Sequence, residues 1–216
     1  MSESQRYDLV AFDLDGTLVE TVADIADALN VALAEVGRAR LSDGEVVKLV
    51  GSGARELVRR ALGGEAGESD RVLARFLEAY AERPCVRSSL YLGVKETLAK
   101  IDAAKAIATN KPGAIARAVV EKLGIAGAFA CVLGEDDVGR RKPDPLIVEI
   151  ARGKVGAARA RTLYVGDSRT DADTAQAAGV DCALVTYGYE APDVLARLPA
   201  RHRIDRFADL LSIVRA

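Results

Sequence analysis

The sequence Phe-Asp-Leu-Asp-Gly-Thr at residues 12–17 places two carboxylates directly after the apolar run 9–12. A short, continuously apolar run is typical of a strand covered on both faces, as in a parallel sheet. Ligands of open parallel sheets bind beyond the carboxyl ends of the strands, and Gly16 permits a sharp turn there. Asp13 and Asp15 are therefore candidate ligands of a cation, although Asp and Gly are also common in ordinary turns.

Five apolar runs of this kind predict the strands of one sheet, at residues 9–12, 106–109, 131–133, 162–165 and 182–185. Helices are predicted between the later strands, at residues 112–123, 144–151 and 171–178. Alternation of strands and helices indicates an α/β fold with a doubly wound parallel sheet.

The segment from residue 20 to residue 88 breaks this alternation. It contains no convincing strand, and its patterns predict helices at residues 22–36, 42–49, 54–62 and 70–81. We expect residues 20–88 to form a small helical cap domain, and residues 1–19 with 89–216 to form the core domain. An insert directly after the first strand is well placed to cover a site at that strand's end. The alternative is that it simply extends the fold.

A second acidic cluster, Val-Gly-Asp-Ser-Arg-Thr-Asp, follows another apolar run at residues 165–171. Asp167 and Asp171 are four residues apart, so they can share one face of a first helical turn. The helix dipole favours acids at this position even without a ligand. With Asp13 and Asp15, they would give one site four carboxylates, which requires a divalent metal and lysines for balance. Oxygen ligands favour Mg²⁺.

Two further segments offer positive charge and hydrogen-bond donors. Lys142, followed by a proline that restricts the chain, can neutralise a phosphate and pair with a nearby carboxylate. Thr109 and Asn110 stand between a predicted strand and a predicted helix, where a hydroxyl and free N–H groups suit phosphate oxygens. For Asn110, a helix N-cap is an equally good explanation.

In their order along the chain, these four segments resemble the motifs of the haloacid dehalogenase superfamily. Those motifs are an apolar run with Asp-x-Asp-Gly-Thr, then Thr or Ser, then Lys, then Gly-Asp-x-x-x-Asp. The four motif sequences of this chain are most similar to the phosphoglycolate phosphatase branch of that superfamily. They are Asp-Leu-Asp-Gly-Thr-Leu, Thr-Asn-Lys-Pro, Arg-Lys-Pro-Asp-Pro and Val-Gly-Asp-Ser-Arg-Thr-Asp. The helical insert occupies the place of that superfamily's first cap type, and residues 50–58 and 60–62 are also similar to that branch.

This resemblance implies a Mg²⁺-dependent phosphomonoesterase that forms a phosphorylated aspartate. It makes Asp13 the nucleophile, while Asp15 protonates the leaving alcohol and then activates water. The implied metal ligands are Asp13, the backbone carbonyl of Asp15, and Asp167. Asp171 is expected to orient the metal shell or Lys142 without necessarily touching the ion.

We predict 2-phosphoglycolate as the substrate. The expected phosphate-binding residues are Thr109, Asn110 and Lys142, and the expected contacts of the leaving group are Gly51, Ser52, Gly53 and Arg55. Glycines allow close backbone approach, and Arg55 can meet a carboxylate such as that of glycolate. A position on the helix surface explains Arg55 equally well. The sequence departs from the superfamily pattern at Glu20-Thr21, where Asp-Ser is usual, so the hinge contacts of the cap stay open.

Other functions within this resemblance are a phosphatase for a sugar phosphate, nucleotide or pyrophosphate, a sugar-phosphate mutase, and a phosphate-binding module without turnover. Asp15 argues against a dehalogenase, which lacks that acid. His202 is the one histidine and lies outside the cap, which argues against a mutase. Lys48, the lysine within the cap, is better explained by a solvated helix than by the Schiff base of a phosphonate hydrolase.

Composition excludes several partners. The net charge is −2 and charges of both signs are interleaved, so no nucleic-acid surface is expected. No run approaches the ~20 apolar residues of a membrane span, and the polar residues 1–6 do not resemble a signal peptide. Cys85, Cys131 and Cys182 are widely spaced, which favours a reducing, cytoplasmic location. The expected partner is a small phosphorylated metabolite, and the sequence leaves monomer and homodimer open.

Overall fold

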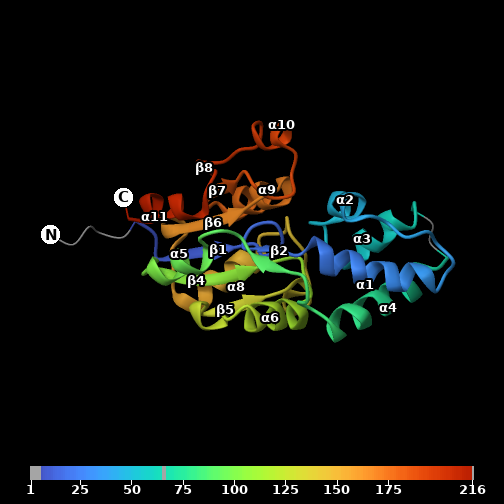
Figure 1. The fold of residues 1–216 in the computed structure, drawn as a ribbon. Coiled ribbons are helices and arrows are strands. Elements are labelled where there is room, and N and C mark those ends of the chain that lie inside the picture. The colour runs from blue at the N-terminus through green and yellow to red at the C-terminus, as the bar shows by residue number, and fades with distance from the viewer. Residues whose placement is uncertain (1–5, 65–66, 216) are drawn as a thin grey trace.

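The computed structural model describes residues 6–64 and 67–215, so the polar residues 1–5 lie outside the described part. Six parallel strands form the central sheet in the order β5-β4-β1-β6-β7-β8 (Figure 1). They are β1 Leu9–Phe12, β4 Ala104–Ala108, β5 Cys131–Leu133, β6 Thr162–Gly166, β7 Asp181–Val185 and β8 His202–Ile204. This is the predicted α/β architecture. The edge strand β8 was not predicted, because three residues with one exposed arginine carry little apolar signal.

β1 lies in the middle of the sheet, paired in parallel with β4 and β6. Its four residues are fully buried, and they alternate between two hydrophobic clusters. Val10 and Phe12 belong to one cluster, while Leu9 and Ala11 belong to the other. Since each face of the strand meets its own core, the continuous apolar run of the sequence is explained.

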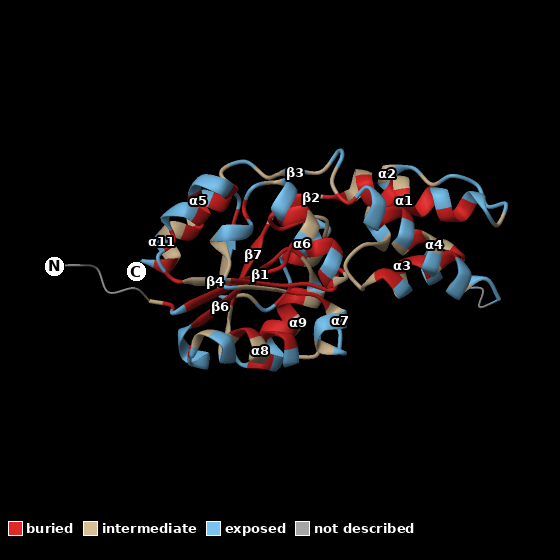
Figure 2. Cartoon of the chain, turned by 90° about the horizontal axis from the view of Figure 1, so that it is seen from below, coloured by how far each residue is buried: buried red, intermediate tan, exposed pale blue. Residues whose placement is uncertain are grey.

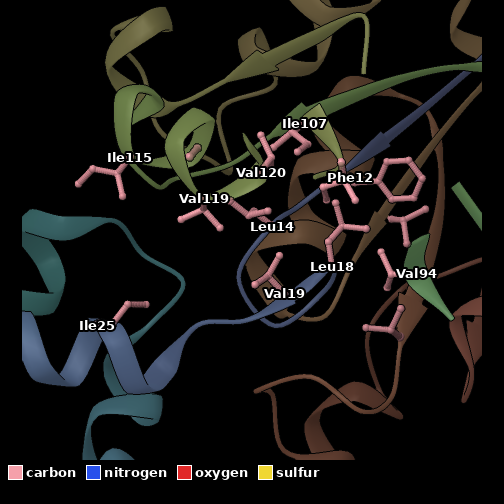
Figure 3. Close-up of a cluster of buried hydrophobic side chains, with 14 of the residues drawn as sticks. Phe12, Leu14, Leu18, Val19, Ile25, Val94, Ile107, Ile115, Val119 and Val120 are labelled. Carbon is pink, nitrogen blue, oxygen red and sulfur yellow. The ribbon is translucent and has the colours of Figure 1, made fainter. Parts of the chain in front are cut away.

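Helices cover both faces of this sheet (Figure 2). The first face carries α5 Val94–Lys100, α6 Gly113–Lys122 and α11 Leu210–Val214, and the second carries α8 Leu146–Val155 and α9 Arg169–Ala178. On the first face, Leu14, Leu18 and Val19 pack in one cluster with Val119 and other residues of α6 (Figure 3). The short helices α7 Glu135–Val138 and α10 Pro192–Leu195 lie in connections between the larger elements.

The inserted segment is helical, as predicted. It contains α1 Val22–Ala34, α2 Asp43–Val46, α3 Ala54–Ala61 and α4 Ser69–Glu82, with a single 3₁₀ turn at Val47–Leu49. These helices form a group beside the carboxyl ends of the sheet strands (Figure 1), and α4 packs against both α1 and α3. No helix in the described residues is both long and apolar enough to cross a membrane.

Two short strands, β2 Val19–Glu20 and β3 Ser89–Leu90, pair antiparallel where the chain leaves the core and returns to it. Two residues per strand are too few to give a sequence pattern, so this ribbon was not predicted. We infer that residues 20–88 form a cap domain and that β2 and β3 connect it to the core.

Asp24, in the first turn of α1, holds the returning chain in place. It is buried, and its carboxylate accepts hydrogen bonds from the backbone N–H groups of Val86, Arg87 and Ser88 at 3.0, 3.0 and 2.8 Å. The Ser88 hydroxyl donates to it as well. Burial alone would raise the pKa of Asp24, but these donors outweigh burial and lower it.

Replacing this carboxylate should destabilise the protein, because three backbone donors lose their acceptor. We expect Asp24→Ala to lower the free energy of unfolding by about 2–4 kcal/mol, measured by urea denaturation at neutral pH. The matched control is Asp27→Ala on the same helix, whose exposed ion pairs with Arg40 and Arg87 should contribute at most about 1 kcal/mol. Equal losses in the two variants would contradict this role of Asp24.

Candidate active site

The predicted site segments meet at the carboxyl edge of the sheet. Asp13 follows β1, Thr109 follows β4, and Asp167 follows β6, and these three strands are adjacent and parallel. Lys142 reaches the same place from the connection between α7 and α8. All four residues are buried. The topology therefore brings together side chains that are up to 154 positions apart in the sequence.

Lys142 is the central cation of this cluster. Its ammonium lies 2.9 Å from Asp13 Oδ1 and 2.7 Å from Asp171 Oδ1, and it donates a hydrogen bond of 2.9 Å to the Tyr164 hydroxyl. Tyr164, on β6, in turn donates to the carbonyl of Ala108 at 2.7 Å. Burial alone would lower the pKa of Lys142, but the carboxylates of Asp13 and Asp171 outweigh burial and raise it well above its usual value. Lys142 is therefore charged at neutral pH.

Asp171 is fully occupied by donors from the protein. Its Oδ2 accepts from the backbone N–H groups of Asp167 and Ser168, both at 3.1 Å, and from the Ser168 hydroxyl, while its Oδ1 faces Lys142. Ser168 and Asp171 form a capping box at the start of α9. These contacts suit a residue that orients Lys142 better than one that binds an ion directly.

Two hydrogen bonds position Asp167, one from Thr17 next to the first pair of carboxylates and one from the segment after β7. Thr17 Oγ1 donates to its Oδ1 at 3.2 Å, and the backbone N–H of Tyr189 donates to its Oδ2 at 2.7 Å. Gly16 has a φ of 83°, and a Cβ at this position would collide with the Asp167 carboxylate. Glycine is therefore needed here for both its backbone conformation and its lack of a side chain.

The acidic groups are crowded enough to perturb one another. Asp13, Asp167 and Asp171 each offer an oxygen within 4.8 Å of the others. Burial, partly offset by Lys142, raises the pKa of Asp13 to about 6, with the carboxylates of Asp171 and Asp15 adding to the rise. Burial and the charges of Asp171 and Asp13 raise the pKa of Asp167 well above its usual value.

This arrangement fits a divalent cation. Its four carboxylates belong to Asp13, Asp15, Asp167 and Asp171, whereas its buried lysines are Lys111 and Lys142. When all four carboxylates are ionised, as ion binding requires, two negative charges remain without a cation from the described protein. Asp13 Oδ1 is buried and makes no hydrogen bond of good geometry, although the Lys142 ammonium is near. Carboxylate oxygens are the ligands that hard divalent ions prefer.

Asp15 faces the inserted helices rather than the acidic cluster. Lys111 Nζ donates to its two oxygens at 2.9 and 3.1 Å, and Thr21 Oγ1 donates to Oδ1 at 2.7 Å. Lys111 also donates to the hydroxyl of Tyr80 on α4 at 2.6 Å. Lys111 was not predicted as a site residue. Its place directly after Thr109 and Asn110 was the one available signal.

Tyr189 connects the candidate site to the hinge, residues 20–21, where the chain leaves the core. Its hydroxyl accepts from the backbone N–H of Thr21 at 2.8 Å and donates to Glu20 Oε1 at 2.8 Å, while Tyr91 donates to the other Glu20 oxygen at 2.9 Å. Glu20 and Thr21, where the sequence departs from the usual motif, therefore make specific contacts of their own. Tyr189 was not predicted, because nothing local in its sequence distinguishes it.

Asn110 connects three segments through its side chain. Its Oδ1 accepts from the backbone N–H of Lys142 at 2.7 Å, and its Nδ2 donates to the carbonyls of Gly51 and Lys142 at 3.1 and 3.2 Å. The N-cap of α6 is Pro112, without a side-chain bond, so the N-cap explanation of Asn110 is wrong. The Asn110 amide thus holds the backbone of Lys142 and the loop at residues 50–53, here called the cap loop.

A cavity of about 40 Å³ lies between the inserted helices and the sheet edge. Its apolar lining includes Ile25, Val50, Ala54, Leu57 and Phe76, and its polar lining includes Asp13, Asp15, Tyr80, Thr109, Asn110 and Lys111. A second cavity of about 240 Å³ shares Asp13 and Asp15 and extends past Asp167 and Tyr189. Both cavities thus open onto the carboxylates of the first motif.

The predicted cap contacts are only partly brought to this cavity. Gly51 and Gly53 line it, whereas Ser52 and Arg55 are not among its described lining residues. Arg55 instead forms an ion pair of 2.6 Å with Asp70, and the side chains are 67% and 87% exposed. The sequence left two explanations of Arg55, a contact with substrate or a position on the helix surface. In this structure Arg55 lies on the surface.

Comparison with known proteins agrees with this geometry. Residues 10–185 match the family model of haloacid dehalogenase-like hydrolases. The chain belongs to the haloacid dehalogenase-like hydrolase family. The predicted resemblance is thereby confirmed.

Relatives within this family carry a common name. The phosphoglycolate phosphatase of Rhodospirillum rubrum is 41% identical over 213 residues, covering 93% of this chain and 88% of that protein. Phosphoglycolate phosphatase 1 of Pseudomonas aeruginosa is 37% identical, covering 94% and 78%. A solved structure described as a predicted phosphoglycolate phosphatase from Haemophilus somnus is 32% identical, with a TM-score of 0.87 and coverage of 96% and 98%.

The raised pKa of Asp13 has a measurable consequence in metal-free protein. Because the folded state holds this proton more tightly than the unfolded state does, stability should fall as the pH rises from about 4 through about 6. Asp13 alone accounts for a loss on the order of 2–3 kcal/mol between pH 4 and pH 7. We expect Asp13→Asn to remove this part of the pH dependence in urea denaturation with EDTA.

The same measurement with Mg²⁺ supplies the control. Mg²⁺ should raise the stability of the unmodified protein more at pH 7 than at pH 5, since the ion requires ionised carboxylates. A pH dependence that is identical in the unmodified protein and in Asp13→Asn would contradict the assignment.

Proposed function

We propose that this family member is a Mg²⁺-dependent phosphatase that hydrolyses 2-phosphoglycolate to glycolate and phosphate through a phosphorylated Asp13. The observation that carries the proposal is that two carboxylates of one motif, Asp13 and Asp15, lie in different surroundings. Asp13 lies buried beside Lys142 and Asp167, whereas Asp15 lies apart among the hydrogen-bond donors Lys111 and Thr21. One is suited to attack phosphorus and the other to transfer protons.

In the first half-reaction, a carboxylate oxygen of Asp13 bonds to phosphorus and the bond from phosphorus to the glycolate oxygen breaks. Asp15 gives its proton to that leaving oxygen. In the second half-reaction, Asp15 takes a proton from water, the water oxygen bonds to phosphorus, and the bond to Asp13 breaks. The products are inorganic phosphate and free Asp13, so the enzyme returns to its starting state.

Lys142 and Thr109 bind the phosphate oxygens on which charge develops. Lys142 is held for this purpose by Asp171 and Tyr164, and its backbone is held by Asn110. Asp13, the backbone carbonyl of Asp15, and Asp167 would hold Mg²⁺, which neutralises charge on the phosphate that would otherwise repel Asp13. The two uncompensated negative charges and the oxygen-only ligands support this choice of ion.

The cavity on the cap side supports a small leaving group. Its volume is about 40 Å³, and much of its lining from the inserted helices is apolar. Ile25, Val50, Leu57 and Phe76 offer no hydrogen-bond partners to the hydroxyl groups of a sugar or nucleoside, so burying hydroxyl groups against them is costly. The names of the relatives also favour 2-phosphoglycolate over the other small phosphates. A cytoplasmic location is proposed with this function, in keeping with three free cysteines.

The direct test is release of inorganic phosphate from 2-phosphoglycolate. We expect turnover with Mg²⁺, none with EDTA, and recovery when Mg²⁺ is restored. A sugar phosphate and a nucleotide monophosphate serve as comparison substrates and should be hydrolysed less efficiently. No phosphate release from any of these compounds between pH 5 and pH 9 would contradict the proposal.

Because Asp13 is proposed as the nucleophile and Asp15 as the residue that transfers protons, we expect different kinetics for their variants. Asp13→Asn should abolish turnover while the fold is retained. Asp15→Asn should lower kcat for 2-phosphoglycolate by about 10²–10⁴. With p-nitrophenyl phosphate, whose leaving group needs no proton, Asp15→Asn should instead release a rapid burst of nitrophenolate followed by slow turnover. Full steady-state activity of Asp15→Asn would mean that Asp15 does not transfer protons.

A further inference from the structure

Lys111 is a buried cation in the cavity of about 40 Å³ that is proposed for the leaving group. Its side chain is 2% exposed, and it is the one cation among the described residues that line the cap-side cavity. Arg55, the residue that the sequence offered for binding a carboxylate, points to Asp70 at the surface instead. A negatively charged leaving group in this cavity therefore has Lys111 as its available cationic partner.

The ammonium of Lys111 is held from two sides. Its hydrogen bonds go to both carboxylate oxygens of Asp15 and to the Tyr80 hydroxyl, and it lies 4.4 Å from the centre of the Tyr80 ring. Asp15 belongs to the core, whereas Tyr80 lies on α4 of the inserted segment. Lys111 donates two hydrogen bonds to Asp15, and one of them suffices to hold that carboxylate. The other can be exchanged for a hydrogen bond to an oxygen of a ligand.

The distances place such an oxygen within reach. A leaving oxygen that is hydrogen-bonded to Asp15 lies about 2.7 Å from its carboxylate, and Lys111 Nζ lies 2.9 Å from the same carboxylate. In a phosphorylated 2-hydroxy acid, a single carbon separates the leaving oxygen from the acid group. Its carboxylate can therefore reach Lys111 while the leaving oxygen is hydrogen-bonded to Asp15.

We propose that Lys111 binds the carboxylate of the leaving group and thereby selects phosphorylated small 2-hydroxy acids over uncharged phosphate esters. This inference rests on the proposed phosphatase function. A carboxylate in a largely apolar cavity needs a hydrogen-bonded cation to offset its loss of hydration. Ile25, Leu57 and Phe76 keep water away from this ion pair and so strengthen it. Tyr80 is a positioning residue, because it fixes the lysine from the cap side.

The test compares 2-phosphoglycolate with 2-phosphoglycolamide, which has the same size but no charge at that end. In the unmodified protein, kcat/KM should favour 2-phosphoglycolate by about tenfold to a hundredfold, the range for a charge-assisted hydrogen bond. In Lys111→Met this ratio should fall to about one. The matched control is Lys95→Met, which removes an exposed lysine from α5 and should keep the full ratio.

The ratio is decisive because Lys111→Met also disturbs Asp15 and lowers turnover of both compounds. A ratio that is unchanged in Lys111→Met would overturn the proposal. Tyr80→Phe is the second variant, since loss of a buried lysine also affects folding. It should reduce the ratio severalfold while it retains the ring, and an unchanged ratio in a folded Tyr80→Phe would count equally against the proposal.

The unmodified protein separates this inference from the function on which it rests. Equal hydrolysis of 2-phosphoglycolate and 2-phosphoglycolamide would overturn the role of Lys111 and leave the phosphatase intact. Hydrolysis of neither compound would overturn both. Competitive inhibition by glycolate that is lost in Lys111→Met, with inhibition by inorganic phosphate retained, would support carboxylate binding independently of turnover.

Discussion

Repulsion among four carboxylates is the constraint around which this site is built. Asp13, Asp167 and Asp171 lie within 4.8 Å of one another in a buried place, and ionising them together is costly unless positive charge is near. Lys142 supplies part of that charge and is fixed by Asp171 and Tyr164. The remaining negative charge creates the demand for a divalent ion.

The positions of the helical segment and of Asp15 depend on the same contacts. Asp15 is held by Thr21 at the hinge and by Lys111, which in turn holds Tyr80 on α4. Asn110 likewise joins the backbone of Lys142 to the carbonyl of Gly51 in the cap loop. Movement of the helices away from the sheet would therefore alter the surroundings of Asp15 and Lys142 together. Through these contacts, the inserted helices and the side chains of the candidate site position one another.

Sequence patterns predicted the features that are local. The strand before Asp13 is a continuous apolar run, and Thr109 and Asp167 likewise end or follow such a run, whereas Lys142 lies farther along, in the connection between α7 and α8. Because parallel strands place their carboxyl ends together, their meeting at one edge could also be predicted. Lys111, Tyr164 and Tyr189 were missed, since their importance arises from partners far away in the chain. Arg55 was predicted to contact the substrate for a related reason. Its partner in this structure is Asp70, and the sequence around Arg55 does not reveal that ion pair.

The central claim is that Asp13 becomes covalently phosphorylated, and trapping that state tests it most directly. The protein would be mixed with 2-phosphoglycolate and Mg²⁺, quenched in acid within one turnover, digested, and analysed by mass spectrometry. We expect one added phosphoryl group on the peptide that contains Asp13, with none in Asp13→Asn. A phosphoryl group on another residue, or undiminished phosphate release by Asp13→Asn, would contradict it.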